Sequence, residues 1–127
     1  MITGIGIDLV EVARIRSMLE RHGERFKERT FTPAEAAYCE RCADAAMHFA
    51  ARFAAKEAAA KALGTGLWSA AGVNWTDIEV LRDEESGRPS LCMHGKAALL
   101  TEGMRAHLSI THTQDHAMAQ VILERCA

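Results

Sequence analysis

The sequence predicts an α+β fold in which an antiparallel sheet packs against a long central helix. Three observations support this class. Strand-like and helix-like segments are interspersed along the chain, several strand pairs are joined by hairpin-like turns, and one long helical segment in the middle is rich in alanine. Hairpin turns connect antiparallel strands, so the sheet is expected to be antiparallel. The 127 residues leave room for a single domain, residues 1–127.

The N-terminal segment Ile2–Leu9 is predicted to be a β-strand because its residues alternate with a period of two. The two faces carry Ile5, Ile7 and Leu9 on one side and Gly4, Gly6 and Asp8 on the other. The second face has no side chains beside the Asp8 carboxylate. A ligand or another backbone segment can therefore approach this face closely.

Three helices are expected next. The first extends from Glu11 to about Arg21, where apolar residues recur at helical spacing. The second follows Thr32-Pro33-Ala34-Glu35, a capping box with proline at the first helical position, and runs to about Arg41. The third is the alanine-rich segment Ala45–Leu63, which Gly64 ends.

The second half of the chain predicts four strands and one short helix. In order, these are a strand Trp75–Leu81, a turn Asp83–Pro89, a strand Ser90–Met93, a helix from about Gly95 to Thr101, and strands Ala106–Thr113 and His116–Glu124 around a tight Gln114-Asp115 turn. Two hairpins in this half favour an antiparallel arrangement.

Composition excludes several functional classes. A net charge of −2 and few aromatic residues argue against a nucleic-acid-binding protein. The N-terminus has no signal-peptide pattern, and no apolar run is long enough to span a membrane, so a cytoplasmic protein with no membrane partner is expected. Cys39 and Cys42 form a C-x-x-C without a second pair at zinc spacing, so the four cysteines are interpreted as reduced thiols.

Two acidic residues are candidate metal ligands. Asp8 can be a strand-end residue that caps the following helix, or it can face a ligand across the glycine strip. Glu57 lies in line with Phe49 and Phe53 on the third helix and is expected to be partly buried, so it needs a partner. That partner can be Lys61, four residues on, or a hard cation shared with Asp8.

Two further clusters can bind charged ligands. Ser109, Thr111 and Thr113 share one face of the predicted strand Ala106–Thr113, His112 lies near its end beside the turn, and hydroxyls with an imidazole suit phosphate oxygens. A buried core histidine is the alternative. The first helix carries a stripe of basic residues around a methionine, namely Arg14, Met18, Arg21 and Arg25. This stripe is either a solvated face or a docking surface for an acidic amphipathic helix.

Together these segments resemble the holo-acyl-carrier-protein synthase family, the small phosphopantetheinyl transferases. The resemblance covers essentially the whole chain. Three blocks carry it: Gly4-Ile5-Gly6-Ile7-Asp8-Leu9-Val10-Glu11-Val12 with Arg14-Ile15; Arg52-Phe53-Ala54-Ala55-Lys56-Glu57-Ala58 followed by Lys61-Ala62-Leu63-Gly64-Thr65-Gly66; and Ser109-Ile110-Thr111-His112-Thr113 with the strand after it.

The resemblance implies transfer of 4′-phosphopantetheine from coenzyme A to a serine of apo acyl carrier protein, for fatty acid or polyketide synthesis. It implies that Asp8 and Glu57 bind Mg²⁺ and that Lys61 lies beside the coenzyme A pyrophosphate as a third catalytic residue. The implied cofactor-binding residues are Arg52, Lys61, Gly64, Ser109, His112 and Thr113, with Arg52, His112 and Thr113 on the 3′-phosphate.

The resemblance also implies a homotrimer with active sites between protomers. The metal pair then comes from one chain and the His112 segment from its neighbour, while Arg14, Met18, Arg21 and Arg25 dock the carrier protein. Two features depart from the family pattern. Residues 43–46 lack the basic residue that often contacts the 3′-phosphate, and whether Arg41 reaches that phosphate instead is left open by the sequence; Met47-His48 replaces larger apolar residues.

Two functions of other classes remain open from the residues alone. The chain can be a non-catalytic binding module, in which the basic helix holds an acidic partner and the polar strand holds a nucleotide. It can also be a structural trimer, in which Asp8 and Glu57 belong to internal ion pairs. A magnesium-dependent release of adenosine bisphosphate separates the enzyme from both.

Overall fold

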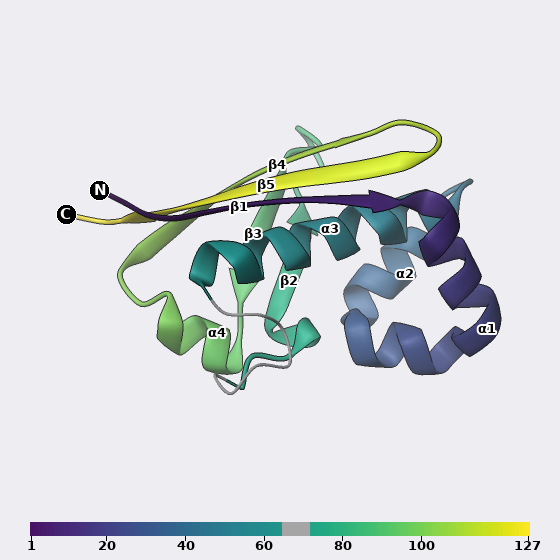
Figure 1. Cartoon of the computed structure of the whole chain (residues 1–127), viewed down its shortest axis with the longest axis horizontal. Helices are drawn as coiled ribbons and strands as arrows, with labels where there is room; N and C mark the ends of the chain where they lie inside the picture. Colours follow the sequence, from purple (N-terminus) through teal and green to yellow (C-terminus); the bar gives the residue numbers. More distant parts are fainter. Residues whose placement is uncertain (65–71) are drawn as a thin grey trace.

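The structure, a computed structural model that describes residues 1–64 and 72–127, has the α+β architecture that the sequence predicts (Figure 1). A three-stranded antiparallel sheet in the order β1-β5-β4 consists of β1 (Ile2–Glu11), β4 (Met104–His112) and β5 (His116–Arg125). A separate antiparallel pair, β2 (Ile78–Arg82) and β3 (Pro89–Met93), runs across the direction of the long strands.

Helix α3 (Ala45–Leu63) lies along one face of the three-stranded sheet (Figure 1). Thirteen of its nineteen residues are buried, so it is the central element of the core rather than an amphipathic surface helix. Helices α1 (Val12–Thr30) and α2 (Pro33–Arg41) pack beside it, and the short α4 (Gly95–Leu100) precedes β4.

Two glycines of β1 let α3 approach the sheet closely. A Cβ atom at Gly4 would overlap the carbonyl oxygen of Ala62, and one at Gly6 would overlap that of Ala58. The glycine strip that the sequence places beside Asp8 is therefore occupied by the backbone of α3. A helix of small residues fits this contact because its own side chains add little thickness.

A buried ion pair joins α3 to α2 and to the second sheet. Lys56 Nζ lies 2.7 Å from Glu35 Oε1, and both side chains are fully buried. Lys56 also donates to the carbonyl oxygens of Trp75 (3.0 Å) and Ile78 (2.6 Å). The Val80 N–H donates to Glu35 Oε2 at 2.8 Å. These bonds supply the partners that a buried charge requires.

Two predicted boundaries were wrong by more than two residues. Helix α1 continues to Thr30 instead of ending near Arg21, with a break at Gly23, where φ is 43° and ψ is −121°. The apolar stripe cannot reveal a helix that resumes after a break. The expected strand Trp75–Leu81 begins as a 3-10 turn, Trp75–Asp77, because Asp77 Oδ2 accepts from the Asn74 N–H (3.0 Å). The strand itself starts at Ile78.

The outer face of the three-stranded sheet is apolar along β1. Ile5, Ile7 and Leu9, the face opposite the glycines, are 61%, 54% and 61% exposed, and Met118 on β5 lies across from Leu9. Large aliphatic side chains in a row on an open sheet are unusual for a surface that stays in water. In the described part of the chain, no helix combines the length and apolar character needed to cross a membrane.

Candidate active site

Asp8 and Lys61 meet between β1 and α3. Asp8 lies on the inner face of β1, beside the two glycines, and Lys61 Nζ is 3.1 Å from its Oδ1. Lys61 also donates to the carbonyl oxygen of Ile7 at 3.0 Å. Two of the sequence interpretations were wrong. Asp8 does not cap the first helix, because Glu11 is the N-cap residue of α1. Within the described residues, Lys61 forms its ion pair with Asp8 and not with Glu57.

Glu57 is half-buried one turn before Lys61 on α3. Burial raises the pKa of the Glu57 carboxyl, and the negative charge of Asp8 raises it further, whereas Lys61 and Arg14 act in the opposite direction. A cation beside Glu57 would offset the effect of the Asp8 charge on the Glu57 carboxyl. Carboxylate oxygens are the ligands that Mg²⁺ prefers, so Asp8 and Glu57 fit such an ion.

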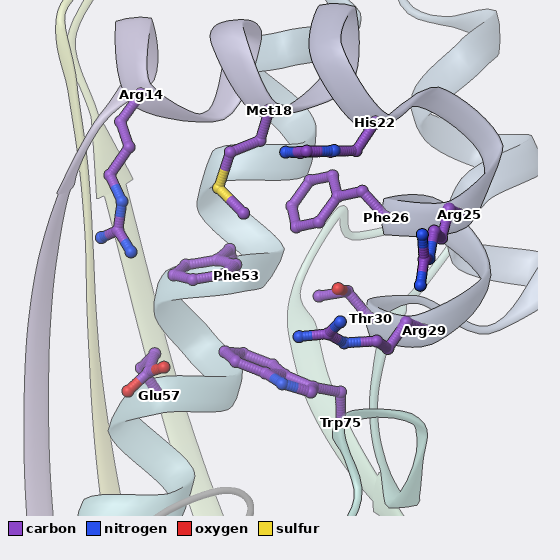
Figure 2. Close-up of a pocket in the computed structure, with 10 residues that line it drawn as sticks. All are labelled: Arg14, Met18, His22, Arg25, Phe26, Arg29, Thr30, Phe53, Glu57 and Trp75. Carbon is purple, nitrogen blue, oxygen red and sulfur yellow. The ribbon is translucent and has the colours of Figure 1, made fainter.

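A cleft of about 400 Å³ extends from Glu57 to α1 (Figure 2). Phe53 and Trp75 form its apolar floor, with ring centroids 4.8 Å apart in a stacked arrangement. The Arg14 guanidinium lies 5.5 Å from the Phe53 ring centroid and points from α1 toward the Glu57 side of the cleft. The cleft thus combines an apolar floor, a basic rim and a carboxylate at one end.

Only part of the predicted basic stripe on the first helix lies in this cleft. Arg14, Met18 and Arg25 line the cleft, but Arg21 is exposed on α1 and does not. Before the break at Gly23, the residues that line the cleft are four apart (Arg14, Met18 and His22), and Arg21, three residues after Met18, lies beside this line. The sequence analysis missed five lining residues, of which only His22 was visible from its spacing of four from Met18; the other four are Phe26, Arg29, Thr30 and Trp75.

A second basic cluster surrounds Tyr38 of α2. The guanidinium of Arg52 lies 4.4 Å from the Tyr38 ring centroid, that of Arg82 5.8 Å and that of Arg41 5.9 Å. All four residues line a cleft of about 350 Å³. Arg52 is buried, and its Nε has no hydrogen-bond partner in the described structure. Three guanidinium groups around one cleft suit an anion such as a phosphate.

His112 belongs to the edge of this cluster. Its ring centroid is 6.2 Å from that of His48, which is 5.9 Å from Tyr38. Burial lowers the pKa of His48, and the positive charges of Arg52 and His112 lower it further. The interpretation of His112 as a buried core residue was wrong, because its side chain is exposed at the end of β4.

The other expected cofactor-binding residues lie apart from this cluster. Ser109 is on the outer face of β4, opposite Gln120, and lines an open groove next to residues 86–90. Thr113 is in the β4–β5 turn, where its Oγ1 accepts from the N–H groups of Asp115 (3.3 Å) and His116 (3.1 Å). Gly64 is the left-handed C-cap of α3, with φ 77°. The rest of the expected glycine loop, Thr65-Gly66, falls outside the described residues.

All four cysteines are free thiols, as expected. Desolvation by burial raises the pKa of the Cys39 thiol to about 12. The Cys42 thiol donates to the carbonyl oxygen of Tyr38 at 3.4 Å. Both thiols are therefore part of the packing around α2.

Comparison with known proteins identifies the family. A family model described as the 4′-phosphopantetheinyl transferase superfamily matches residues 4–121. The chain is 55% identical to a holo-[acyl-carrier-protein] synthase of Koribacter versatilis, over 98% of this chain and 99% of that protein. It is 50% identical to one from Solibacter usitatus, with the same coverage.

Solved structures agree. The holo-(acyl-carrier-protein) synthase of Bacillus anthracis, in complex with CoA (3′,5′-ADP), is 39% identical, with a TM-score of 0.82 and 98% of both chains covered. That of Neisseria meningitidis is 34% identical, with a TM-score of 0.88, over 98% of this chain and all of that one. The chain therefore belongs to the holo-acyl-carrier-protein synthase family of the 4′-phosphopantetheinyl transferase superfamily.

Proposed function

We propose that the chain transfers the 4′-phosphopantetheine arm of coenzyme A to a serine of an apo acyl carrier protein and releases adenosine 3′,5′-bisphosphate. One observation carries the proposal: Asp8, Glu57 and Lys61 converge at the end of a cleft with a basic rim. A hydroxyl brought through this cleft meets two carboxylates and an ammonium group. Family membership supports the same reaction.

Asp8 and Glu57 are proposed to hold a Mg²⁺ ion, because the charge of Asp8 disfavours the ionised form of Glu57, a penalty that a cation bound by both carboxylates would remove. When bound, Mg²⁺ supplies positive charge that stabilises the diphosphate and its leaving oxygen. Lys61 provides a second positive charge beside Asp8, where it neutralises the diphosphate of coenzyme A.

The Tyr38 cluster is proposed to bind the 3′-phosphate of coenzyme A. Of the expected ligands Arg52, His112 and Thr113, the first two belong to this cluster, which also contains Arg41 and Arg82. Arg41 therefore substitutes for the basic residue that residues 43–46 lack. Arg52 is held in place by burial, whereas Arg41 and Arg82 are exposed and free to close on an anion.

The cleft between α1 and α3 is proposed to dock the carrier protein. An acidic amphipathic helix needs positive charge for its carboxylates and an apolar surface for its other face. Arg14 and Arg25 supply the charge, and Met18, Phe26 and Phe53 supply the apolar surface. The serine of such a partner would then enter the Glu57 end of the cleft (Figure 2).

The catalytic unit is proposed to be a homotrimer. Its support is the exposed aliphatic face of β1, which a neighbouring protomer can cover. Asp8 and His112 are on opposite edge strands of the sheet, β1 and β4. An assembly through this sheet can place His112 of one protomer beside the Asp8–Glu57 pair of the next, so that one coenzyme A contacts both protomers.

Mass spectrometry of an apo carrier protein tests the function. Incubation with this chain, coenzyme A and Mg²⁺ should add one phosphopantetheine mass to the carrier, and adenosine 3′,5′-bisphosphate should appear in equal amount. Excess chelator should stop both. Binding of the carrier without any mass gain, in the presence of Mg²⁺, would instead identify a non-catalytic binding module.

A further inference from the structure

Three side chains of different chemistry converge on one face of the β2–β3 hairpin. Glu79 and Cys92 are directly paired across the two strands, so their side chains lie on the same face. His94 is two residues after Cys92 and shares that face, because strand side chains alternate with a period of two. A carboxylate oxygen, the thiol sulfur and a ring nitrogen of these residues all lie within 4.8 Å of one another.

We infer that Glu79, Cys92 and His94 form a binding site for a zinc-class divalent metal ion. Thiolate and imidazole ligands select borderline-soft ions such as Zn²⁺, whereas Mg²⁺ prefers an all-oxygen shell. Tetrahedral zinc with these ligands places donor atoms about 3.4–3.6 Å apart. Glu79 Oε1 lies 3.0 Å from His94 Nε2, and the three donor atoms all lie within 4.8 Å of one another, which brackets this spacing and leaves a fourth position for water.

The carboxylate of this cluster is held in position. Thr32 Oγ1 donates to Glu79 Oε2 at 2.6 Å, which leaves Oε1 directed at His94 Nε2, 3.0 Å away. Outer hydrogen bonds of this kind orient metal ligands and tune their affinity. The Glu79 side chain is only 14% exposed, so its geometry is set by packing as well as by Thr32.

A second histidine–glutamate pair provides a comparison within the chain. His107 Nε2 lies 3.0 Å from Glu124 Oε1, as in the first pair, but both side chains are largely exposed. Within the described residues, only the Glu79 cluster adds a third ligand type. The Glu79 cluster differs from the His107–Glu124 pair because it also contains Cys92, and a histidine–glutamate ion pair on the surface does not require a thiol.

The ion would connect elements that the transfer reaction does not use directly. Its ligands come from β2, β3 and the residue before α4, and Thr32 extends the connection to the start of α2. None of the three ligands belongs to the Asp8–Glu57 site or to the Tyr38 cluster. The site is therefore a structural clamp, and we expect its main effect to be on stability rather than on the chemical step.

Zinc and cobalt binding to the untagged full-length chain tests the site, with excess Mg²⁺ present to occupy carboxylate-only sites. About one Zn²⁺ per chain should bind, and Co²⁺ should give a thiolate-to-cobalt charge-transfer band. Cys92→Ser should abolish that band and, with His94→Gln, weaken zinc binding at least tenfold, the lower end of the roughly 10- to 100-fold loss seen even for outer-shell partners.

His107→Gln and Cys126→Ser are the matched controls, because they remove an exposed histidine of the same pairing and an exposed thiol. Both should bind zinc as the wild type does. Zinc should also raise the thermal midpoint of the wild type but not of Cys92→Ser. The inference is overturned if Cys92→Ser, with an unchanged circular dichroism spectrum, retains wild-type zinc affinity, or if the cobalt band depends on Cys126 instead.

Discussion

Lys56 Nζ lies 2.7 Å from Glu35 Oε1, and neither side chain is exposed to solvent. The pair connects α3 to α2, and Lys56 directly precedes the candidate metal ligand Glu57. Four further hydrogen bonds surround it, two from Lys56 to carbonyl oxygens and two from backbone N–H groups to Glu35. The position of Glu57 along α3 is therefore set by a buried polar network as well as by alanine packing.

Removal of either partner should strongly destabilise the protein. Lys56→Met leaves a buried carboxylate without its counter-charge, and the expected loss in the free energy of unfolding is about 3–5 kcal/mol. Chemical denaturation measures it. Arg16→Met is the control, because Arg16 pairs with Asp44 at 3.4 Å on the surface, where such pairs contribute about 0–1 kcal/mol. Equal losses in the two variants would refute a structural role for the buried pair.

Glu57→Gln should stabilise the metal-free protein near pH 7 while abolishing transfer. Burial and the charge of Asp8 raise the pKa of Glu57, so its ionised form costs stability at every pH above that raised value. The penalty disappears at low pH, below the ordinary glutamate pKa of about 4.3. The thermal midpoint of the variant should thus exceed that of the wild type at pH 7 in chelator, and the difference should vanish on acidification.

A Glu57→Gln variant less stable than the wild type at pH 7 would contradict the proposed repulsion between the carboxylates. Asp8→Ala should also abolish transfer, with the fold retained. Normal turnover by either variant in a labelled coenzyme A assay would remove the basis of the metal-site proposal.

Arg14→Glu should raise the KM for the carrier protein much more than the KM for coenzyme A. Arg14 is at the rim of the cleft, above Phe53, where the change replaces attraction for an acidic helix by repulsion. Arg21→Glu is the matched control: it changes the same charge on the same helix, outside the cleft. Equal effects of the two substitutions would show that net charge, not this cleft, steers the carrier.

Arg41→Ala and Arg82→Ala should each reduce discrimination between coenzyme A and 3′-dephospho-coenzyme A. Both guanidinium groups are exposed beside Tyr38, so their loss should affect phosphate binding rather than folding. A tenfold fall in the ratio of the two kcat/KM values would correspond to about 1.4 kcal/mol. Lys96→Ala removes an exposed positive charge on α4 and should leave the ratio unchanged. An unchanged ratio in both arginine variants would place the 3′-phosphate elsewhere.

Ile7→Glu should convert the proposed trimer into monomers and lower activity. Ile7 is 54% exposed on the outer face of β1, and a carboxylate there would be buried against a neighbouring protomer. Sedimentation and the activity assay check this together. Leu99→Glu is the control, since Leu99 is equally exposed but lies on α4. A trimer that survives Ile7→Glu would require another interface.

The sequence predicted the elements better than it predicted their interruptions. Capping and alanine content located α2 and α3, and alternation located β1, because these are local properties of the chain. The break at Gly23 is a change of backbone conformation at one residue, and the 3-10 turn at Trp75 follows a hydrogen bond between Asn74 and Asp77; neither leaves a mark in the apolar periodicity. Local sequence patterns were equally limited in predicting which residues meet at the candidate site. Family resemblance supplied Asp8, Glu57 and Lys61, but Arg82 joins the Tyr38 cluster only through tertiary packing.

Because Gly4 and Gly6 have no side chains, the backbone of α3 lies directly against the backbone of β1. Asp8 extends from that strand and Glu57 from that helix, so the gap between the two elements also sets the distance between the two carboxylates. A methyl group at Gly6 would overlap the carbonyl oxygen of Ala58, so the strand and the helix would have to move apart. Substitutions at these two glycines should consequently disturb the packing of α3 on β1 and the relative position of Asp8 and Glu57 together.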